Sequence, residues 1–202
     1  MTSPNTREAI LAAASALYAD RGYDAVSMRD VAAAVAIQPA SLYHHFKDKD
    51  ALILAALEHA LAAKAAPARD ILLDKRPPEQ RLDAFLDQLA RMFFDDAVFA
   101  RLTLRGMLEG ADQRKAYLAR TVIDSVFTPL SRLIAELSGA VDPDLAAASI
   151  LSLVIGHTQL ASTFVHLPRE LRTLGQANAF SAYIQDFVRR SLGLPRRLEA
   201  AP

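Results

Sequence analysis

The chain has 202 residues, no cysteine and equal numbers of basic and acidic side chains, 23 of each. The absence of cysteine excludes disulfides and thiolate zinc sites, and a zero net charge provides no general attraction to nucleic acid. Hydrophobic residues make up 52% of the chain, enough for a sizeable core. No uninterrupted apolar run reaches the roughly 18 residues of a membrane span, and the start lacks the pattern of a secretory signal. We therefore expect a cytoplasmic protein without a membrane segment.

The N-terminal third of the sequence predicts four helices. The first has an apolar stripe formed by Ile10, Ala13 and Leu17, and Gly22 is placed to end it. Ser27 with Asp30 three residues later resembles a capping box at the start of a second helix, 27–34. Proline at position 39 suits the first turn of a third helix, 38–45. A longer helix should run from Asp48 to about residue 65.

The rest of the chain also shows helical periodicity. After a proline-containing connection, "APARDILLDKRPPEQ", the pattern predicts helices over 79–95, 98–109, 113–137, 143–166 and 176–192. We expect Pro129 to kink or divide the 113–137 element. Strand-like alternation of useful length is missing, so the sequence predicts an all-α fold of about nine helices.

The two short helices, 27–34 and 38–45, are joined by "VAIQ" and follow a longer helix. This is the spacing of a helix-turn-helix unit, whose second helix lies in the major groove of DNA. The residues placed to form its small core are Met28, Val31, Ala32, Val35, Ile37 and Leu42, with Phe46 closing it. The residues expected to face outward are Gln38, Ala40, Ser41, Tyr43 and His44.

The segment "REAILAAASALYADRGYDAVSMRDVAAAVAIQPASLYHHFKDKDALILAAL" resembles the DNA-binding domain of tetracycline-repressor-type (TetR) transcriptional regulators. The shared features are "A-x-x-L-x-x-x-x-G-Y", a Ser or Thr before the second helix, and "L-Y-x-H-F-x-x-K-x-x-L", together spanning about residues 7–57. The resemblance implies nine helices, a homodimer, and a divergent C-terminal domain that binds small effectors. Three positions depart from the usual pattern: Ala36 and Ala40 stand where glycine is frequent, and Gln38 replaces a Ser or Thr cap.

The resemblance also implies DNA contacts. Tyr43, His44 and Lys49 would contact phosphates, and Ser27 would offer its hydroxyl and nearby N–H groups to the opposite strand. The amide of Gln38 is the first candidate for base readout because it can pair bidentately with adenine, and Ser41 is the second. The full predicted set is Ser27, Arg29, Gln38, Pro39, Ala40, Ser41, Tyr43, His44, Lys47 and Lys49.

Charge gives mixed support to this interpretation. Residues 38–47 contain no acid, but residues 1–65 carry six basic and seven acidic side chains, a net charge of −1. We therefore expect modest non-specific DNA affinity. In the alternative interpretation, Tyr43, His44 and His45 form an ordinary half-buried aromatic cluster, and for His45 packing is as good an explanation as contact.

The C-terminal part offers candidates for an effector pocket. Around residues 93–117, apolar side chains alternate with an arginine row, and "VIGHTQLASTF" places polar groups in an apolar helix. The predicted pocket is mostly apolar, with Arg105 or His157 as polar anchor. Its residues are Leu57, Phe93, Phe94, Phe99, Leu104, Arg105, Met107, Tyr117, Val154, His157 and Phe164. The alternative is a filled core beside a solvated face on which Arg105 pairs with Glu109.

The predicted helices 143–166 and 176–192 are apolar over much of their surface, so each needs more than one partner. A second subunit can supply one, which predicts a homodimer with a four-helix seam. The residues assigned to that seam are Leu151, Ile155, Phe180, Ile184 and Phe187. We expect a DNA-binding domain over 1–47, an effector and dimerisation domain over 48–192, and a flexible tail over 193–202.

The sequence shows no pattern of enzyme or metal chemistry. The histidines outside 38–47 are not spaced as HxxxH or HxxH pairs, and Gly-rich phosphate loops and a G-x-S-x-G elbow are missing. We therefore predict no cofactor, no metal site and no enzymatic activity. The prediction is a DNA-binding transcriptional regulator, a repressor released from a palindromic double-stranded operator by a small molecule. The alternative is a helical small-molecule-binding or protein-interaction protein without DNA function, which the net charge of −1 favours.

Overall fold

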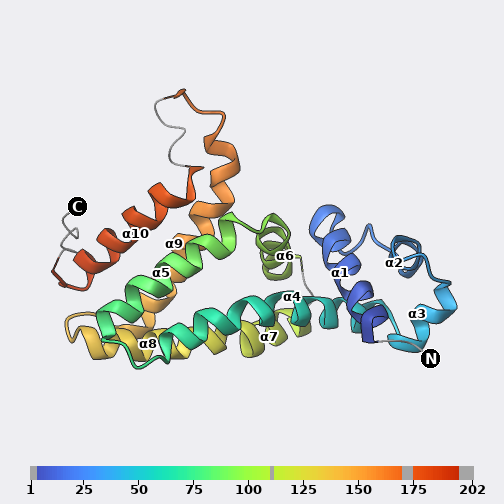
Figure 1. Cartoon of the computed structure of the whole chain (residues 1–202), viewed down its shortest axis with the longest axis horizontal. Helices are drawn as coiled ribbons and strands as arrows, with labels where there is room; N and C mark the ends of the chain where they lie inside the picture. The colour runs from blue at the N-terminus through green and yellow to red at the C-terminus, as the bar shows by residue number, and fades with distance from the viewer. Residues whose placement is uncertain (1–3, 110–111, 170–174, 196–202) are drawn as a thin grey trace. The chain divides into compact units, whose positions relative to one another are not determined.

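The structure is a computed structural model, and it describes residues 4–109, 112–169 and 175–195. Over these residues it is helical without strands (Figure 1). The helices are α1 (Pro4–Arg21), α2 (Met28–Ala34), α3 (Pro39–His45), α4 (Lys49–Leu72), α5 (Pro78–Phe94), α6 (Ala97–Leu108), α7 (Asp112–Leu118), a π-helical turn η1 (Ala119–Ile123), α8 (Asp124–Leu137), α9 (Pro143–Phe164) and α10 (Ala177–Ser191). The predicted all-α class is confirmed. Because α7, η1 and α8 form one continuous run, the described residues contain nine separate helical rods.

Helix α4 is longer than predicted. The prolines after residue 65 predict a connection, but α4 continues through Pro67 to Leu72. Its apolar face explains the difference, since Leu61, Ala65, Ala68 and Leu72 repeat at helical spacing and are all buried. Burial of this face offsets the backbone hydrogen bond that Pro67 cannot donate.

The predicted 113–137 helix is irregular at a different place from the one expected. Helix α8 continues through Pro129, so the proline does not divide it. The change in helical geometry comes earlier, at η1 (Ala119–Ile123), where the backbone widens into a π-helical turn. Single π-helical turns of this kind occur within α-helices as local insertions.

Two helices, α4 and α9, are long and apolar enough to cross a membrane by length and mean hydropathy alone. The prediction of no membrane segment considered uninterrupted apolar runs, and these helices contain scattered polar residues. Core and interface helices pass the same composition test. Only 22% of the most apolar window of α9 is buried, against 39% for α4. Helix α9 therefore presents apolar surface that its own protomer does not cover.

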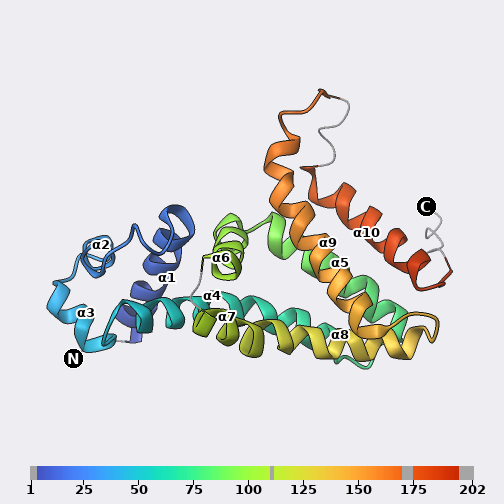
Figure 2. The same ribbon diagram turned by 180° about the vertical axis from the view of Figure 1, so that it is seen from behind.

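The chain divides into two compact units, residues 1–65 with 97–123, and residues 66–96 with 124–202. In the first unit, α1 packs against α2 and α6, and α2 packs against α3 (Figures 1 and 2). The second unit is built from α5 with α8, α9 and α10. The first unit thus adds α6 and α7 to the N-terminal helices. The predicted boundary between the DNA-binding and effector domains, at residues 47/48, does not coincide with the boundary between these compact units, and it remains a prediction.

Helix α1 turns a different face inward from the one predicted. Ala13 and Leu17 are only half-buried. The buried side of the helix carries Ile10, Leu11, Ala14 and Tyr18. The face is rotated because the larger Leu11 and Tyr18 side chains are both buried in this arrangement, and they remove more apolar surface from water.

In the second unit, a buried ion cluster joins α10 to α5. The Arg189 side chain is 5% exposed, and its Nη1 lies 3.2 Å from a carboxylate oxygen of Asp83. Its Nη2 also bonds Glu79, and its Nε donates to the Pro195 carbonyl at 2.8 Å. This last bond holds residue 195 of the predicted 193–202 tail, while residues 196–202 lie outside the described part. A buried charge needs such a full set of partners.

Candidate nucleic-acid interface

The start of α2 is held by the predicted capping box. The Asp30 backbone N–H donates to Ser27 Oγ at 3.2 Å, and the Ser27 backbone N–H donates to Asp30 Oδ2 at 2.7 Å. The Ser27 hydroxyl also donates to the same carboxylate at 2.6 Å. The two hydrogen bonds that the Asp30 carboxylate accepts, from the Ser27 hydroxyl first and from the Ser27 backbone N–H second, lower the pKa of Asp30. The Ser27 proton is therefore engaged, and its predicted contact with a phosphate requires the hydroxyl to leave Asp30.

The turn between α2 and α3 adopts the conformation for which glycine is usual. Ala36 has φ of +54° and is the single non-glycine residue with positive φ in the described chain. Its N–H and that of Ile37 donate to carbonyls at the end of α2. The tight helix-turn-helix geometry is thus kept at a cost of about 1–2 kcal/mol in backbone strain.

The small core beneath the two helices is largely the predicted one. Met28, Val31, Ala32, Leu42 and Phe46 are buried. Val35 and Ile37 are only half-buried, because they lie at the turn between the two helices rather than inside the core. This core leaves the outer face of α3 without packing partners from the described part of its own protomer.

That outer face presents the predicted contact residues to solvent. Tyr43 is 54% exposed, a high value for a tyrosine. The other exposed members of the predicted set are Arg29, Gln38, Ala40, His44 and Lys47, while Pro39, Ser41 and Lys49 are half-buried. Gln38 precedes α3 in extended conformation and makes no side-chain capping bond. The face offers donors and an amide, the groups that bind phosphates and base edges.

His45 differs from its neighbour His44. It is half-buried, and its ring lies 6.3 Å from that of Phe46. The packing explanation for His45 is thus supported, whereas the exposure of Tyr43 and His44 contradicts a half-buried aromatic cluster there.

Lys49, at the start of α4, is held by residues to which the sequence analysis gave no role at the DNA interface. Its Nζ lies 4.0 Å from the centroid of the Tyr23 ring. The Tyr23 hydroxyl donates to Asp50 Oδ1 at 3.0 Å, which fixes the ring. A cation over an aromatic face is worth about 0.5–1 kcal/mol at an exposed site, so the ammonium is oriented but remains available. The "G-Y" pair in the sequence was the available signal.

Arg7 is a further basic residue at this end of the unit. Its guanidinium carbon lies 5.4 Å from the centroid of the Phe46 ring, next to the C-terminus of α3. Sequence distance hid this juxtaposition, because 39 positions separate the two residues.

The predicted effector residues fall into both compact units. The first unit holds Leu57, Phe99, Leu104, Arg105, Met107 and Tyr117, and the second holds Phe93, Phe94, Val154, His157 and Phe164. Leu57, Phe93, Phe99 and Val154 are buried. Burial and a hydrogen bond to Glu58 raise the pKa of Tyr117. Within the first unit, Leu57 and Arg105 line a cavity of about 30 Å³, room for about one water.

The Arg105 guanidinium is hydrogen-bonded within the first unit, and its role as polar anchor of a pocket remains a prediction. Its Nε donates to the Ala19 carbonyl at 3.2 Å and its Nη2 to the Asp20 carbonyl at 3.3 Å. Its Nη1 bonds Glu109 Oε1 at 2.7 Å, which is the pairing that the alternative interpretation expected. The guanidinium therefore caps the end of α1, a role that sequence reasoning missed.

His157 lies in an aromatic cluster of the second unit. Its ring stacks on Phe180 with centroids 4.0 Å apart and planes at 12°. Phe164 meets it edge-on at 5.4 Å, and Phe94 lies at 6.4 Å. The polar residue predicted inside the apolar α9 is thus surrounded by three phenyl rings.

The predicted dimer residues do not all face outward. Phe180 and Ile184 are buried within the protomer against the rest of the second unit, so they are not available to a partner. Tyr183 and Phe187 lie along the edge of this buried face of α10, and they are 54% and 41% exposed. Leu151 and Ile155 of α9 are half-buried.

A broad apolar groove follows the outer sides of α9 and α10. Its volume is about 640 Å³, and Leu145, Leu153 and Phe187 are among the residues that line it. Leu145 is 69% exposed, and Leu160, further along α9, is 53% exposed. Contiguous exposed apolar surface is typical of interaction sites.

This architecture and the exposed face of α3 define a helix-turn-helix protein with an added helical domain. Residues 10–56 match the family model described as bacterial regulatory proteins, tetR family. This match places the likeness to tetR family regulators in the helix-turn-helix part of the chain.

Curated relatives match part of the chain. The HTH-type transcriptional repressor BdcR of Escherichia coli is 36% identical over 86 residues, 43% of this chain and 44% of that protein. An HTH-type transcriptional regulator of Mycobacterium bovis is 34% identical over 118 residues, 58% of this chain and 57% of that protein. The chain thus matches about half the length of these relatives.

Solved structures match nearly the whole fold. A regulatory protein in the tetR family from Rhodococcus RHA1 has a TM-score of 0.78 at 22% identity, over 96% of this chain and 100% of that one. The fatty acid degradation regulator FadR from Bacillus halodurans has the same TM-score at 13% identity and the same coverage. At such identities the likeness establishes the fold and not the ligand.

Proposed function

We propose that the chain is a DNA-binding transcriptional regulator, a repressor that a small-molecule effector releases from its operator. The observation that carries the proposal is the outer face of α3, which exposes Gln38, Tyr43, His44 and Lys47 over a packed helix-turn-helix core. The repressor name of the Escherichia coli relative supports it.

In the proposed complex, α3 enters the major groove and the N-terminus of α2 meets the backbone. Tyr43, His44 and Lys49 donate to phosphate oxygens, and Gln38 reads a base edge. Ser27 contributes once its hydroxyl turns from Asp30, and Arg29 lies in the same first turn of α2. The absence of acids between residues 38 and 47 leaves this face suited to a polyanion.

A homodimer would present two such faces. We propose that the groove along α9 and α10, which Phe187 lines on its α10 side and against which Tyr183 stacks, is covered by the same surface of a second copy. A two-fold axis would then pair two α3 helices with half-sites one DNA turn apart, about 34–36 Å, on a palindromic operator.

For the effector, we propose contacts in the second unit around His157. Three phenyl rings and an imidazole suit a mostly apolar ligand with one polar group. Helix α4 begins at Lys49 and continues to Leu72, so a single helix connects the proposed phosphate contact to the chain of the second unit. The effector acts only by binding the DNA-free form more tightly.

A gel shift with the upstream region of the protein's own gene tests the DNA function. We expect Tyr43→Phe and Lys49→Ala to weaken binding to all sequences about equally, and Lys49→Ala to reduce the salt slope by roughly one. Lys64→Ala is the matched control, because it removes a lysine about 22 Å further along the same helix. It should leave both quantities unchanged.

Gln38→Ala separates base readout from phosphate binding. We expect it to relax preference at one base position by about 1–3 kcal/mol without changing the salt slope. A selection on randomised half-sites measures this. If wild-type protein shows no preference for any duplex, the protein is instead a ligand-binding or interaction protein without DNA function. An unaltered preference in Gln38→Ala would remove that residue from readout.

A further inference from the structure

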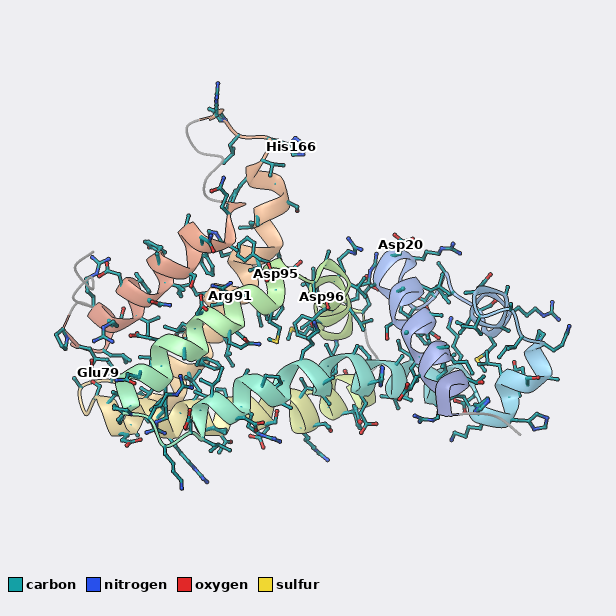
Figure 3. The ribbon with its side chains drawn as sticks, viewed as in Figure 1. Asp20, Glu79, Arg91, Asp95, Asp96 and His166 are labelled. Carbon is teal, nitrogen blue, oxygen red and sulfur yellow. The ribbon has the colours of Figure 1, made fainter. Side chains whose placement is uncertain are left out.

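The C-terminal end of α1 is closed by a side chain from α6. The last carbonyls of a helix lack intrahelical donors and lie at the negative end of its dipole. Arg105 supplies both a cation and two donors, to Ala19 O at 3.2 Å and Asp20 O at 3.3 Å. Asp20 lies at the end of α1 (Figure 3), and α6 packs against this helix and lies beside it in both ribbon views (Figures 1 and 2). The α1–α6 contact therefore has a specific polar connection.

The backbone at Gly22 makes room for this guanidinium. Gly22 has φ of +83°, and a Cβ there would lie 2.7 Å from Arg105 Nη1 and 3.2 Å from Glu109 Oε2. The Gly22 N–H donates to the Tyr18 carbonyl at 3.0 Å and ends the helix. Arg105, Glu109 and the Gly22 turn are thus fitted to one another.

Tyr23, the next residue, makes a cation–π contact with Lys49. Its ring lies beneath the ammonium at 4.0 Å and stacks on the buried Tyr18 at 6.2 Å. Tyr18 and Tyr23 line the same cavity of about 30 Å³ as Arg105 and Glu109. Because these four side chains share the lining of one small cavity, the positions of Arg105 and Tyr23 are coupled through it as well as through the Gly22 turn.

We propose that Arg105 is a positioning residue for DNA binding. By capping α1 it sets the Gly22–Tyr23 turn, and through the Tyr23 ring it places the Lys49 ammonium for its phosphate, without touching DNA itself. The inference rests on the proposed function in that Lys49 is taken as a phosphate contact. The competing explanation is an ordinary partly exposed Arg105–Glu109 ion pair, which would affect neither Lys49 nor DNA.

The first test is DNA affinity and its salt dependence for Arg105→Met. We expect affinity to fall about fivefold to tenfold, and the salt slope to fall by roughly one as in Lys49→Ala. A mere loss of folded protein would lower the active fraction and leave the slope unchanged. Arg101→Met, an exposed arginine one turn earlier on α6, is the matched control and should behave as wild type.

A double-mutant cycle shows whether Arg105 acts through Lys49. In the Lys49→Ala background, Arg105→Met should cost little further affinity, because the contact that it positions is already absent. Arg105→Lys keeps the charge near Glu109 and should restore only part of the loss, since it lacks the planar fork that reaches two carbonyls. Additive losses in the cycle, or an unchanged salt slope, would overturn the proposal.

A measurement without DNA keeps the inference separate from the proposed function. The Tyr23 ring should shift the NMR signals of the Lys49 side-chain methylenes upfield in the free protein. We expect this shift to disappear in Tyr23→Leu, to diminish in Arg105→Met and to persist in Arg101→Met. If the shift responds but the wild type binds no duplex, the DNA function is wrong while the connection stands. If the Lys49 methylene shift is unchanged in Arg105→Met, the proposed connection from Arg105 through Tyr23 to Lys49 is wrong, even in a protein that binds DNA.

Discussion

Tyr43 on α3 and Tyr183 on α10 are equally exposed, at 54% each, yet they belong to opposite kinds of surface. Tyr43 stands among His44, Lys47 and Gln38, whose donors suit an anionic partner. Tyr183 stacks on Phe187 at 5.9 Å, beside the apolar groove of α9 and α10. An exposed aromatic ring alone therefore does not identify its partner. The neighbouring groups do, because they decide whether water or an apolar surface is the better environment.

The largest expected effect is a loss of dimer association when a charge is placed on the exposed apolar surface of α9. Leu160→Glu on α9 should cost the proposed dimer about 3–5 kcal/mol, since a carboxylate would be buried without a partner, while the protomer keeps its fold. Light scattering across a concentration series measures the association. Leu73→Glu is the control, because Leu73 is 62% exposed and lies just beyond the C-terminal end of α4, outside α9 and α10. A Leu160→Glu protein that associates as tightly as wild type would show that the α9 face is not the interface.

A methyl group added at Gly22 tests how closely Arg105 fits the end of α1 in the first unit. Gly22→Ala should lower the free energy of unfolding by about 2–4 kcal/mol, because positive φ is strained for alanine and the new Cβ displaces the Arg105 guanidinium from two carbonyls. The distance of 2.7 Å from that Cβ position to Nη1 leaves no room for both. Urea unfolding followed by circular dichroism gives the value. Stability equal to wild type would mean that the α1 end does not depend on this fit.

The same substitution in the second unit should act in the opposite direction. Gly156 is exposed on α9, and a Cβ there would meet nothing within 4 Å in the described part of the protomer. Gly156→Ala should therefore stabilise the protomer by about 0.5–1 kcal/mol through helix propensity. Urea unfolding in the Leu160→Glu background measures this without the dimer. A gain there that becomes a loss in the wild-type background would locate a close helix crossing at Gly156.

A similarly small effect is expected at the helix-turn-helix turn. Ala36 has φ of +54°, so Ala36→Gly relieves strain of about 1–2 kcal/mol but adds unfolded-state entropy worth about 0.4–1 kcal/mol. A net gain of roughly 0.5–1 kcal/mol is expected from urea unfolding, with DNA affinity little changed. Destabilisation by Ala36→Gly would contradict the strained geometry of this turn.

Much of the first unit was decided by local sequence. Ser27 with Asp30, Gly22 and the Pro39 start each act within a few residues, and all appear where the pattern predicts them. Capping hydrogen bonds and backbone preferences depend on residues that are close in the sequence, so they can be predicted from the sequence alone. The exposure of Tyr43 and His44 followed from the same register.

Tertiary structure alone decided which neighbour each apolar or charged side chain meets. Periodicity shows that α10 has an apolar side, but packing on α5 turned Phe180 and Ile184 inward and left Tyr183 and Phe187 for a partner. Arg105 looked like a pocket anchor, yet 86 positions separate it from the carbonyl at the end of α1 that it caps. Helix signals act over about four residues, whereas such contacts depend on how whole helices pack. For that reason the sequence determined the helices and the contact face, and the packed structure determined the partners of these residues.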